Sequence, residues 1–595
     1  MKSSFTVFVL LFCIAAHSQI VNIPDGNFKN ALVNENVVDT DGNGSGDRDA
    51  DLNDDGEIQI SEALAVLRLI VDNRNIGSLE GLEEFVNLQK LRCEKNQIES
   101  LDVSSLAQLE QLTCEDNMLT ALDITQNPIL AWLKCRNNQI SILDLSQNPE
   151  FYYVDCRNNL LSALDVSFNL ILRTLKSANN PIGTLDVSLN PSLAYLICGN
   201  NGLSSLDVSQ NTELIELDFS NNQISTIDVS NSPLLYDLIC YSNQLSDLNL
   251  LNNPELNFLD CSYNQIQILD LEQNSNLQDL NCSVNAISTL NLTNMIGLGH
   301  LNCKSNNLST LDVSQNLSLI NLNVSDNNLT ELTLIFHRFL FDLYCSNNNI
   351  SNLNIVESNG LRIMECDSNN LTQLNVSRYV GLLRLKVDSN LFTELNVSSN
   401  TVLADLGCSN NQLTSLDTSA NFRLENLDAS NNQITHLDLS QNPSLITLDC
   451  ADNALESLNV KNNFNTQVNK MFANNNPGLT CIQVDDADFA NGQICDIPNN
   501  DGWCKDTTAN YSEECQLGTE NFSFSEIRLF PNPVGDILNI DTKDNFESLK
   551  IYSTQGILIN EIFSKTLDVS DLNSGIYLAQ ITADGKKTTL KFIKD

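Results

Sequence analysis

The fold is decided by the stretch Leu133-Lys134-Cys135-Arg136-Asn137-Asn138-Gln139-Ile140-Ser141-Ile142-Leu143-Asp144-Leu145-Ser146, whose frame returns along most of the chain. Its central asparagine recurs every 21 residues without an insertion or deletion. A fixed period of this length is typical of a solenoid, in which each unit buries its apolar side only against its neighbours. We therefore expect function on a surface rather than in a pocket. The eighteen copies are Asn96, Asn117, Asn138, Asn159, Asn180, Asn201, Asn222, Asn243, Asn264, Asn285, Asn306, Asn327, Asn348, Asn369, Asn390, Asn411, Asn432 and Asn453.

Each repeat begins as a strand and then turns at the asparagine. Leu91 and Cys93 alternate with Arg92 at the period of a strand, so the first two point inward and the arginine points outward. The side-chain amide of the repeat asparagine both donates and accepts hydrogen bonds. A stack of these amides is therefore expected to pair the backbone groups that the turn leaves open on successive coils.

The frame Leu-x-Cys-x-x-Asn-x-Leu/Ile resembles the core of the leucine-rich repeat, with Cys in place of the second Leu, from about Leu67 to Leu479. The transition from the N-terminal segment into the repeats resembles that of internalin-like proteins. The resemblance implies a right-handed superhelix with a parallel sheet on its concave face. The expected fold class is a repeat solenoid followed by a small all-β sandwich.

Thirteen of the 18 cysteines occupy one repeat position, three residues before the asparagine. Other repeats place Ser177, Phe219, Val324, Val387 and Ala429 there. A position that accepts Val, Phe and Ala is an inward packing position, where free Cys acts as a small hydrophobe. We expect these thiols to be free and buried.

A second column carries Asp in eleven repeats, as at Asp102, Asp123 and Asp144, Asn in six repeats, and Thr333 in one. These side chains either cap the following turn or form a stripe that holds cations. Turn capping is the simpler interpretation, and the sequence leaves both open.

The concave face carries a candidate binding site in repeats three to nine. Trp, Tyr and Arg are enriched at binding hot spots, and basic residues on one face are unexpected in a chain with net charge −44. The alternative is that aromatic residues simply suit exposed strand positions. The candidate ligand-binding residues are Trp132, Lys134, Arg136, Tyr153, Arg157, Lys176, Tyr195, Tyr236 and Phe258. A second, weaker basic cluster is formed by Arg362, Arg384 and Lys386.

Nucleic-acid binding and catalysis are not expected. The 75 acidic against 31 basic residues repel phosphate backbones. His300, His337 and His436 stand in different repeats, and the array has no irregular insertion that could gather catalytic groups.

The chain is expected to be exported. Lys2 precedes an apolar run that ends at Ala16, and Ala16-His17-Ser18 offers a signal-peptidase site. We see no transmembrane segment in the mature chain. The expected domains are a signal peptide (1–18), an N-terminal cap (19–66), the solenoid (67–480), a cysteine-containing C-terminal cap (481–515), a linker (516–523) and a C-terminal domain (524–595).

The N-terminal cap contains a twelve-residue stretch, from Asp51 to Glu62, that matches an EF-hand loop. Side-chain oxygens stand at positions 1, 3 and 5, Gly56 at the sharp turn and Glu at position 12. We expect one structural calcium ion, followed by a helix over Ala63–Val71; the alternative is an acidic turn without metal. The expected metal residues are Asp51, Asn53, Asp55, Glu57 and Glu62. The motif from Asp51 to Glu62 also resembles half of a dockerin repeat. A dockerin needs two such loops, and the upstream stretch that begins at Asp39 lacks the Glu at position 12.

The four C-terminal cysteines lie outside the repeat column. In an exported cap an even number is expected to form two disulfides, and we favour Cys481–Cys515 around Cys495–Cys504, one of three possible pairings. After them, alternating strand patterns predict a small β-sandwich. Pro531-Asn532-Pro533, Gly575-Ile576-Tyr577 and the terminal Lys591–Lys594 resemble the sorting domain of the type IX (Por) secretion system. The resemblance implies partnership with that machinery and a secreted or cell-surface location.

Together these features predict an exported, non-catalytic binding protein that recognises a protein or a glycan through its concave face. The alternative is a structural surface or matrix component without a specific ligand. A hydrolase is the least favoured class, because no catalytic constellation is present in the sequence.

Overall fold

The computed structural model describes residues 19–497, 499, 501–515, 527–543, 545–553, 557–583 and 586–595. The expected signal peptide and the linker at 516–523 lie outside the described residues. The chain forms two compact units, Met1–Glu513 and Glu514–Asp595.

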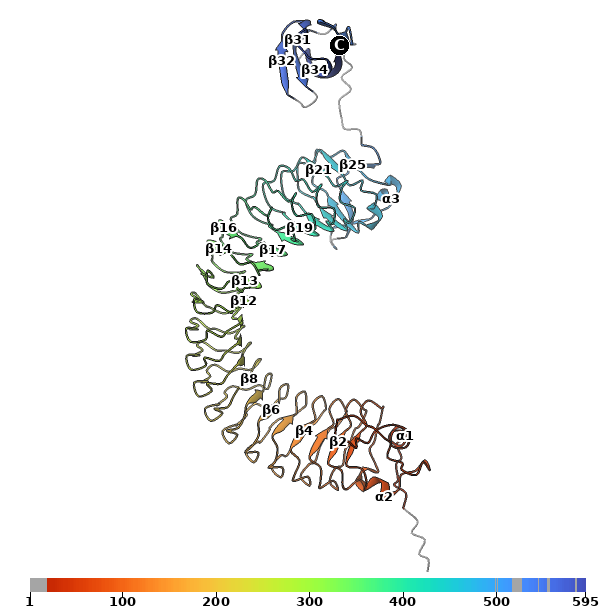
Figure 1. Cartoon of the computed structure of the whole chain (residues 1–595), viewed down its shortest axis with the longest axis vertical. Coiled ribbons are helices and arrows are strands. Elements are labelled where there is room, and N and C mark those ends of the chain that lie inside the picture. Colours follow the sequence, from red (N-terminus) through yellow and green to blue (C-terminus); the bar gives the residue numbers. More distant parts are fainter. Residues whose placement is uncertain are drawn as a thin grey trace, which may run out of the picture. The chain divides into compact units, whose positions relative to one another are not determined.

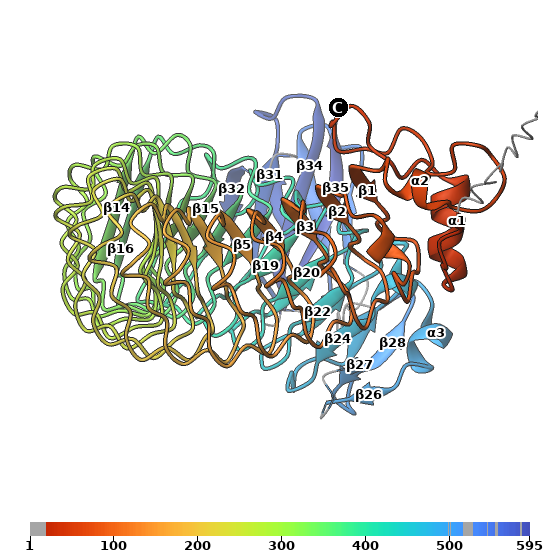
Figure 2. The same ribbon diagram turned by 90° about the horizontal axis from the view of Figure 1, so that it is seen from below.

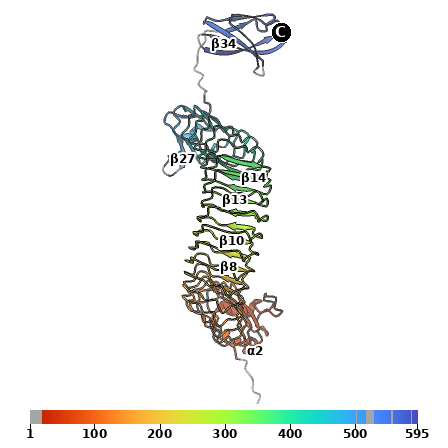
Figure 3. The same cartoon turned by 90° about the vertical axis from the view of Figure 1, so that its left-hand side faces the viewer.

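The first unit is a curved solenoid whose long sheet follows the inner side of the curve (Figure 1). In the described residues this sheet has 22 strands, parallel except for β26. Paired residues stand one repeat apart, as with Leu133 and Val154, and β8, β10 and β13 lie one above another (Figure 3). The strands are β1 (Arg68–Ile70), β2 (Lys90–Arg92), β3 (Gln111–Thr113), β4 (Trp132–Lys134), β5 (Tyr153–Asp155), β6 (Thr174–Lys176), β7 (Tyr195–Ile197), β8 (Glu216–Asp218), β9 (Asp237–Ile239), β10 (Phe258–Asp260), β11 (Asp279–Asn281), β12 (His300–Asn302), β13 (Asn321–Asn323), β15 (Asp342–Tyr344), β17 (Ile363–Glu365), β18 (Arg384–Lys386), β19 (Asp405–Gly407), β20 (Asn426–Asp428), β22 (Thr447–Asp449), β24 (Lys470–Ala473), β26 (Cys495–Asp496) and β27 (Asp501–Lys505).

Two smaller parallel sheets are formed by the segments that follow the concave strand within their coils. One pairs β14 (Glu331–Ile335) with β16 (Asn352–Val356), on the outer side away from β15 (Figures 1 and 2). The other joins β21 (His436–Asp438), β23 (Ser457–Asn459), β25 (Cys481–Gln483) and β28 (Asn510–Ser512). The coils therefore continue through the segment that contains the four C-terminal cysteines.

The interior confirms the predicted cysteine column. Leu133 and Cys135 are fully buried, and the thirteen column cysteines are free and buried. Burial raises the pKa of the Cys114 thiol to about 12, so this thiol stays protonated and unreactive at neutral pH.

The repeat asparagines form the predicted ladder. The Asn138 amide nitrogen donates to the carbonyls of Cys114 (3.0 Å) and Cys135 (3.1 Å), and its oxygen accepts from the backbone N–H of Leu119 (2.9 Å). The amide thus pairs backbone groups of successive coils, and neighbouring rungs share a carbonyl, since Asn117 also donates to Cys114 at 3.2 Å. Asn476 adds a further rung after a break in the 21-residue register, donating to the Cys450 carbonyl at 3.1 Å.

A second buried asparagine ladder was not anticipated. The Asn148 amide nitrogen donates to the carbonyls of Ile124 (2.9 Å) and Asn127 (2.8 Å). The same position holds fully buried Asn in many coils but His337 in one, where Nε2 lies 3.1 Å from the Val313 carbonyl. The signal in the sequence was the recurring Gln-Asn-Pro, as at Gln147, Asn148 and Pro149.

The N-terminal cap covers the first coil with α1 (Gly26–Asn34), whose Phe28, Ala31 and Leu32 are buried. A short helix, α2 (Ile60–Ala63), follows the EF-hand-like loop, and the 3-10 helix η1 (Leu82–Glu84) closes the first coil. The expected helix over Ala63–Val71 is wrong: Arg68–Ile70 forms strand β1, because Leu69 is needed inside the sheet beside Leu91.

The far end of the solenoid is closed by the 3-10 helix η2 (Asn465–Gln467), the helix α3 (Ala487–Asn491) and a disulfide between Cys495 and Cys504. Cys481 and Cys515 are disulfide-bonded as well. These bonds agree with the favoured pairing.

The second unit is a small antiparallel β-sandwich, as the sequence predicted. One sheet holds β29 (Arg528–Phe530), β30 (Ile537–Asp541) and β33 (Thr566–Asp568); the other holds β31 (Phe546–Ser553), β32 (Leu558–Ile562), β34 (Gly575–Ala583) and β35 (Lys586–Lys594). Asn532 ties the Pro-Asn-Pro turn to β35, since its Oδ1 accepts from Ile593 N–H at 2.8 Å. The Tyr577 hydroxyl donates to the Asn573 carbonyl at 2.8 Å. The motif residues therefore hold this domain together.

Candidate functional site

The concave face places the expected aromatic residues side by side. Trp132 on β4 and Tyr153 on β5 are paired in register, and their rings stack at 3.7 Å with 6° between the planes. Tyr152 meets the Trp132 ring edge-on at 5.7 Å, while Lys134 Nζ lies 5.4 Å from the Trp132 centroid. Such stacks and cation–π contacts fix the orientation of half-exposed side chains before any ligand arrives.

The remaining expected residues are less closely grouped. Tyr195 lies in the same row as Tyr153 with Thr174 between them, and Lys176 stands at the end of β6. Phe258 lies three coils further along the sheet, and Tyr236, which is 45% exposed, stands just outside β9. The structure therefore brings together Trp132, Lys134 and Tyr153, with Tyr195 nearby, and leaves Tyr236 and Phe258 apart.

The arginines of this region are paired with acids of the same face. An Arg136 guanidinium nitrogen lies 2.9 Å from a carboxylate oxygen of Glu115, and Arg157 lies 2.7 Å from Asp155. The pKa of Glu115 is raised, because burial outweighs the attraction of Arg136. Both arginines are thus held by carboxylates that the sequence pattern had not singled out.

Unlike these two arginines, the lysines that the structure describes in this region have no carboxylate partner and can contact a ligand. Within the described part of the chain, Lys134 and Lys176 form no ion pair, and neither does Arg173 at the start of the β6 coil. On the concave face, the strands β4 to β7 and the residues next to them hold one carboxylate, Asp155, and five cations, Lys134, Arg136, Arg157, Arg173 and Lys176. These concave positions are therefore positive, although residues 131–200 as a whole carry five basic and five acidic residues.

Two of the three cations in the weaker basic cluster of the C-terminal half are paired with acids. Arg384 and Lys386 contact the two oxygens of Asp405 at 3.0 and 2.6 Å, and Arg384 also lies 3.4 Å from Glu365. Arg362 packs over the Phe341 ring at 5.0 Å. Arg384 and Lys386 are thus neutralised by acids of the same face, whereas Arg362 has a ring contact and no ion pair within the described residues.

An acidic pair lies beside that network. Burial and a hydrogen bond to Asp388 raise the pKa of Asp367 to about 7. Burial also raises the pKa of Asp449 to about 6. The Asp388 side chain lies across Gly407, where a Cβ would collide with its carboxylate.

A chain of exposed amides runs along the edge of the concave sheet. The residue before each ladder asparagine has positive φ, near +55° at Asn137, Asn158 and Asn179, which favours Asn. Asn158 donates to Asn137 at 2.5 Å, Asn179 to Asn158 at 2.6 Å and Asn200 to Asn179 at 2.9 Å. The sequence signal for this chain was the Asn-Asn doublet.

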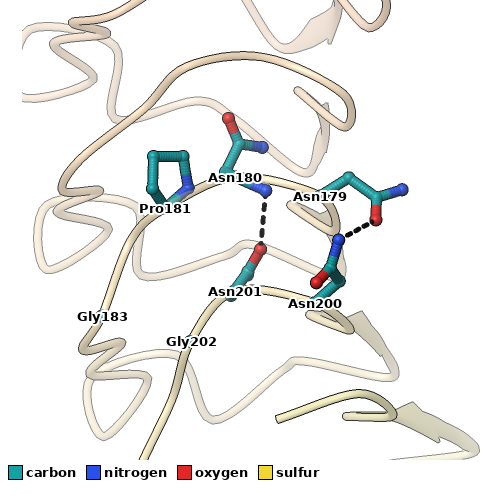
Figure 4. Close-up of a pocket in the computed structure, with 7 residues that line it drawn as sticks. All are labelled: Asn179, Asn180, Pro181, Gly183, Asn200, Asn201 and Gly202. Atoms are coloured by element: carbon teal, nitrogen blue, oxygen red, sulfur yellow. Dashed lines mark hydrogen bonds between the residues drawn. The ribbon is translucent and has the colours of Figure 1, made fainter.

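The chain of amides ends at a shallow pocket of about 500 Å³ (Figure 4). Here the buried ladder changes partners, because the Asn180 backbone N–H donates to Asn201 Oδ1 at 3.1 Å. Pro181 stands where other repeats place a residue with a backbone N–H, such as Gln139, and Gly183 stands where they place an exposed polar residue, such as Ser141. The pocket therefore offers amide groups only.

The Asp column caps turns, as the simpler interpretation predicted. Asp102 Oδ1 accepts from the Ser104 backbone N–H at 2.9 Å, and Asp207 does the same for Ser209. These hydrogen bonds lower the pKa of both carboxyls.

The EF-hand-like loop has part of the expected geometry. Asp51 accepts from Gly56 N–H at 2.8 Å, Asn53 from Asp55 N–H at 2.9 Å, and Gly56 has φ near +81°. Asp55 accepts from the Glu57 backbone N–H at 3.0 Å, while the Glu57 side chain pairs with Lys29 at 2.7 Å. The side chains at positions 1, 3 and 5 are thus held by loop N–H groups, in a turn suited to calcium.

Glu62 departs from a ligand's position. Its two oxygens accept from the backbone N–H groups of Leu52 and Gln59, both at 2.9 Å, so it caps α2. Across the described residues, the group of three carboxylates whose oxygens lie within 4.8 Å of one another is found in the upstream stretch instead. That group consists of Asp39, Asp41 and Asp47.

Comparison with known proteins found similarity for both the C-terminal domain and the repeat region. Residues 528–595 match the family described as a secretion system C-terminal sorting domain. No curated protein sequence matches the chain significantly.

Three solved structures illustrate the likeness of the repeat region. YopM from Yersinia enterocolitica is 27% identical over 70% of this chain and 91% of its own, with a TM-score of 0.58. The plant peptide hormone receptor RGFR1, solved in complex with RGF2, is 18% identical over 70% and 82%, with a TM-score of 0.53. The functional domain of InlJ from Listeria monocytogenes, which includes a cysteine ladder, is 22% identical over 97% and 98%, with a TM-score of 0.45.

The chain therefore has the leucine-rich repeat fold and ends in a sorting domain for type IX export, to the cell surface or the medium. Among the described residues, no helix has the length and apolar character needed to cross a bilayer.

Proposed function

We propose that this exported leucine-rich repeat protein is a non-catalytic binding protein that captures a protein or glycan ligand on its concave face, around Trp132 and Tyr153. The observation that carries the proposal is the stacked Trp132–Tyr153 pair with the unpaired Lys134 beside it. Aromatic anchors held rigidly at the centre of a surface are typical of binding hot spots. The complex of RGFR1 with RGF2 supports a binding role for the fold in general terms.

The geometry of the stack favours a particular mode of contact. Because the stack covers one face of each ring, a ligand can meet the ring edges, the remaining faces and the Lys134 ammonium. The surrounding stretch has unpaired Lys176 and Arg173, so a ligand with acidic groups is favoured over a basic one.

An array of purified surface proteins and glycans, probed with the full chain, tests the proposal. Capture is expected for the native chain and absent for the Trp132→Ala/Tyr153→Ala variant, whose melting temperature should stay close to native. Unchanged capture by the double variant removes this site. If no array component is captured, the alternative of a structural matrix component is favoured. Intact ligand after prolonged incubation tests the non-catalytic part.

We also propose that one calcium ion stabilises the N-terminal cap at the loop from Asp51 to Glu62. Asp51, Asn53 and Asp55 supply the side-chain oxygens and Glu57 its backbone carbonyl; Glu62 would have to release its cap to Leu52 and Gln59. A melting temperature raised by calcium and lowered by chelator is expected, with Asp51→Ala abolishing the response. A response lost in Asp41→Asn but kept in Asp51→Ala would assign the ion to the upstream stretch instead.

A further inference from the structure

A groove lies on the outer side of the solenoid, beside the strand β16. Its cavity of about 950 Å³ extends over four successive coils. Asn354, Asn375, Asn396 and Asp417 line it from the same column of each coil. The groove therefore follows the axis of the solenoid, across the coils.

The polar lining of this groove is less acidic than the N-terminal part of its column. The column carries Asp in seven successive coils from Asp102 to Asp228, but it holds Thr333, Asn354, Asn375 and Asn396 in the four coils around β14 and β16. The lining has no Lys or Arg, and its carboxylates are Glu394 and Asp417. Amides and hydroxyls thus replace charge where the surface is hollowed.

The amide nitrogens are free to bind a ligand. Asn375 Oδ1 accepts from the Ser377 N–H (3.1 Å) and hydroxyl (2.7 Å), and Asn396 Oδ1 accepts from Ser398 in the same way. Within the described residues, neither Nδ2 group donates to the protein. Because coils are spaced by about 4.8 Å, the same donor is presented at regular intervals along the groove.

Apolar surface accompanies these donors. The core leucine that is buried in most coils is partly exposed at Leu353 and Leu374, as is Ile355 on β16. The groove thus combines amide donors, hydroxyls, two carboxylate acceptors and short aliphatic strips.

One backbone carbonyl of β16 is already occupied, which disfavours addition of a peptide strand at this edge. Tyr379, which is buried, donates its hydroxyl to the Ile355 carbonyl at 3.3 Å. It stands where the next coil places Asn400, which donates to the Val376 carbonyl. A docking strand would lose that carbonyl, so recognition falls to the side chains that line the groove.

We propose that this groove binds a neutral, unbranched oligosaccharide that runs along the axis of the solenoid. Sugar hydroxyls donate to Glu394 and Asp417 and accept from the Asn375 and Asn396 amides, while their C–H faces contact Leu353 and Leu374. Regularly repeated donors suit a polymer of repeated units. The acidic surface of the chain disfavours an anionic glycan.

Calorimetry with the full chain tests the proposal, using neutral β-linked glucan, mannan and xylan hexasaccharides, and oligogalacturonate as the anionic arm. At least one neutral hexasaccharide is expected to bind, more tightly than its disaccharide. Asn375→Asp/Asn396→Asp should weaken this binding at least tenfold, because it removes both donors and adds charge. The variant is expected to fold, since Asp fills this column in eleven coils.

Asn249→Asp/Asn291→Asp is the matched control, because it makes the same change in the same column outside the groove and should leave affinity unchanged. The proposal is overturned if no neutral hexasaccharide binds, if the groove variant binds as well as the control, or if oligogalacturonate or an extended peptide binds more tightly. Trp132→Ala/Tyr153→Ala should still bind the oligosaccharide in the groove. Failure of the proposed concave-face function can therefore be told apart from failure of the groove proposal.

Discussion

Residues 131–200 and residues 362–452 have the same coil geometry, but their concave surfaces differ in whether their lysines are paired with acids. The first stretch has two unpaired lysines and a ring stack; in the second, Arg384 and Lys386 are paired with Asp405, and Asp367 shares a hydrogen bond with Asp388. The inward leucines and the asparagine ladder are the same in both. The core therefore sets the coil, and the outward positions are free to differ.

The first surface therefore has cations available to a ligand, whereas Arg384 and Lys386 of the second are paired within the protein. A cation paired with a carboxylate of its own face gains little from a ligand, because the ligand must replace an existing contact. Lys134 and Lys176 have no such contact to replace. Binding by the N-terminal half and stability effects in the C-terminal half are the expected consequences.

The largest effect is expected for the ring pair. Trp132→Ala/Tyr153→Ala should weaken capture at least about 100-fold, since hot-spot aromatics contribute about 2 kcal/mol or more each. The matched control is Tyr344→Ala, a half-exposed concave tyrosine in β15. Affinities of the two variants for the captured ligand decide the point; an equal loss would place binding along the whole face.

A smaller effect is expected for charge. Lys134→Glu/Lys176→Glu should slow ligand association about tenfold at low ionic strength, and less in high salt, because unpaired rim charges act through long-range attraction. Arg384→Glu/Lys386→Glu should leave association unchanged and lower the melting temperature. The two substitutions, together with Glu365 and Asp405, place four acids side by side. Stopped-flow association at two salt concentrations measures both. A slower rate in the second variant would contradict the comparison.

Much of this architecture could be predicted from the sequence because it is periodic. Cys135 and Asn138 repeat at fixed spacing, so the inward column and the first ladder follow from the period alone. The sorting domain was recognisable from its turn residues, such as Asn532 and Tyr577, which tie its strands together.

The rest depends on contacts between coils. Arg157 is neutralised by Asp155 two residues away, and Arg136 by Glu115, 21 residues earlier, so counting basic residues overstated the free charge. The local pattern of Ala63–Val71 predicts a helix, but pairing with the neighbouring coil makes Leu69 part of the sheet. Calcium at Asp51 and the ligand of Trp132 stay predictions.

The acidic half should respond to pH through Asp367. Its folded pKa is raised to about 7, so the folded state binds the proton more tightly than the unfolded chain does. Stability should therefore fall as pH rises from about 4 to 7 and stay lower above that. Asp367→Asn, which mimics the protonated acid, should add on the order of 1 kcal/mol at pH 8, allowing for solvent screening, and nothing at pH 4. Denaturant melts at both pH values test this; an equal gain at pH 4 would contradict it.

The smallest effects compare single lysines. Lys134→Met should change the free energy of unfolding by less than about 0.5 kcal/mol, because its charge has no carboxylate partner. Lys386→Met should cost about 1 kcal/mol, because it leaves the half-buried Asp405 without the ammonium at 2.6 Å. Denaturant unfolding and ligand affinity are measured for both variants. Lys134→Met is expected to bind the ligand more weakly, and Lys386→Met is expected to be less stable. Identical rankings would mean that both halves use their cations in the same way.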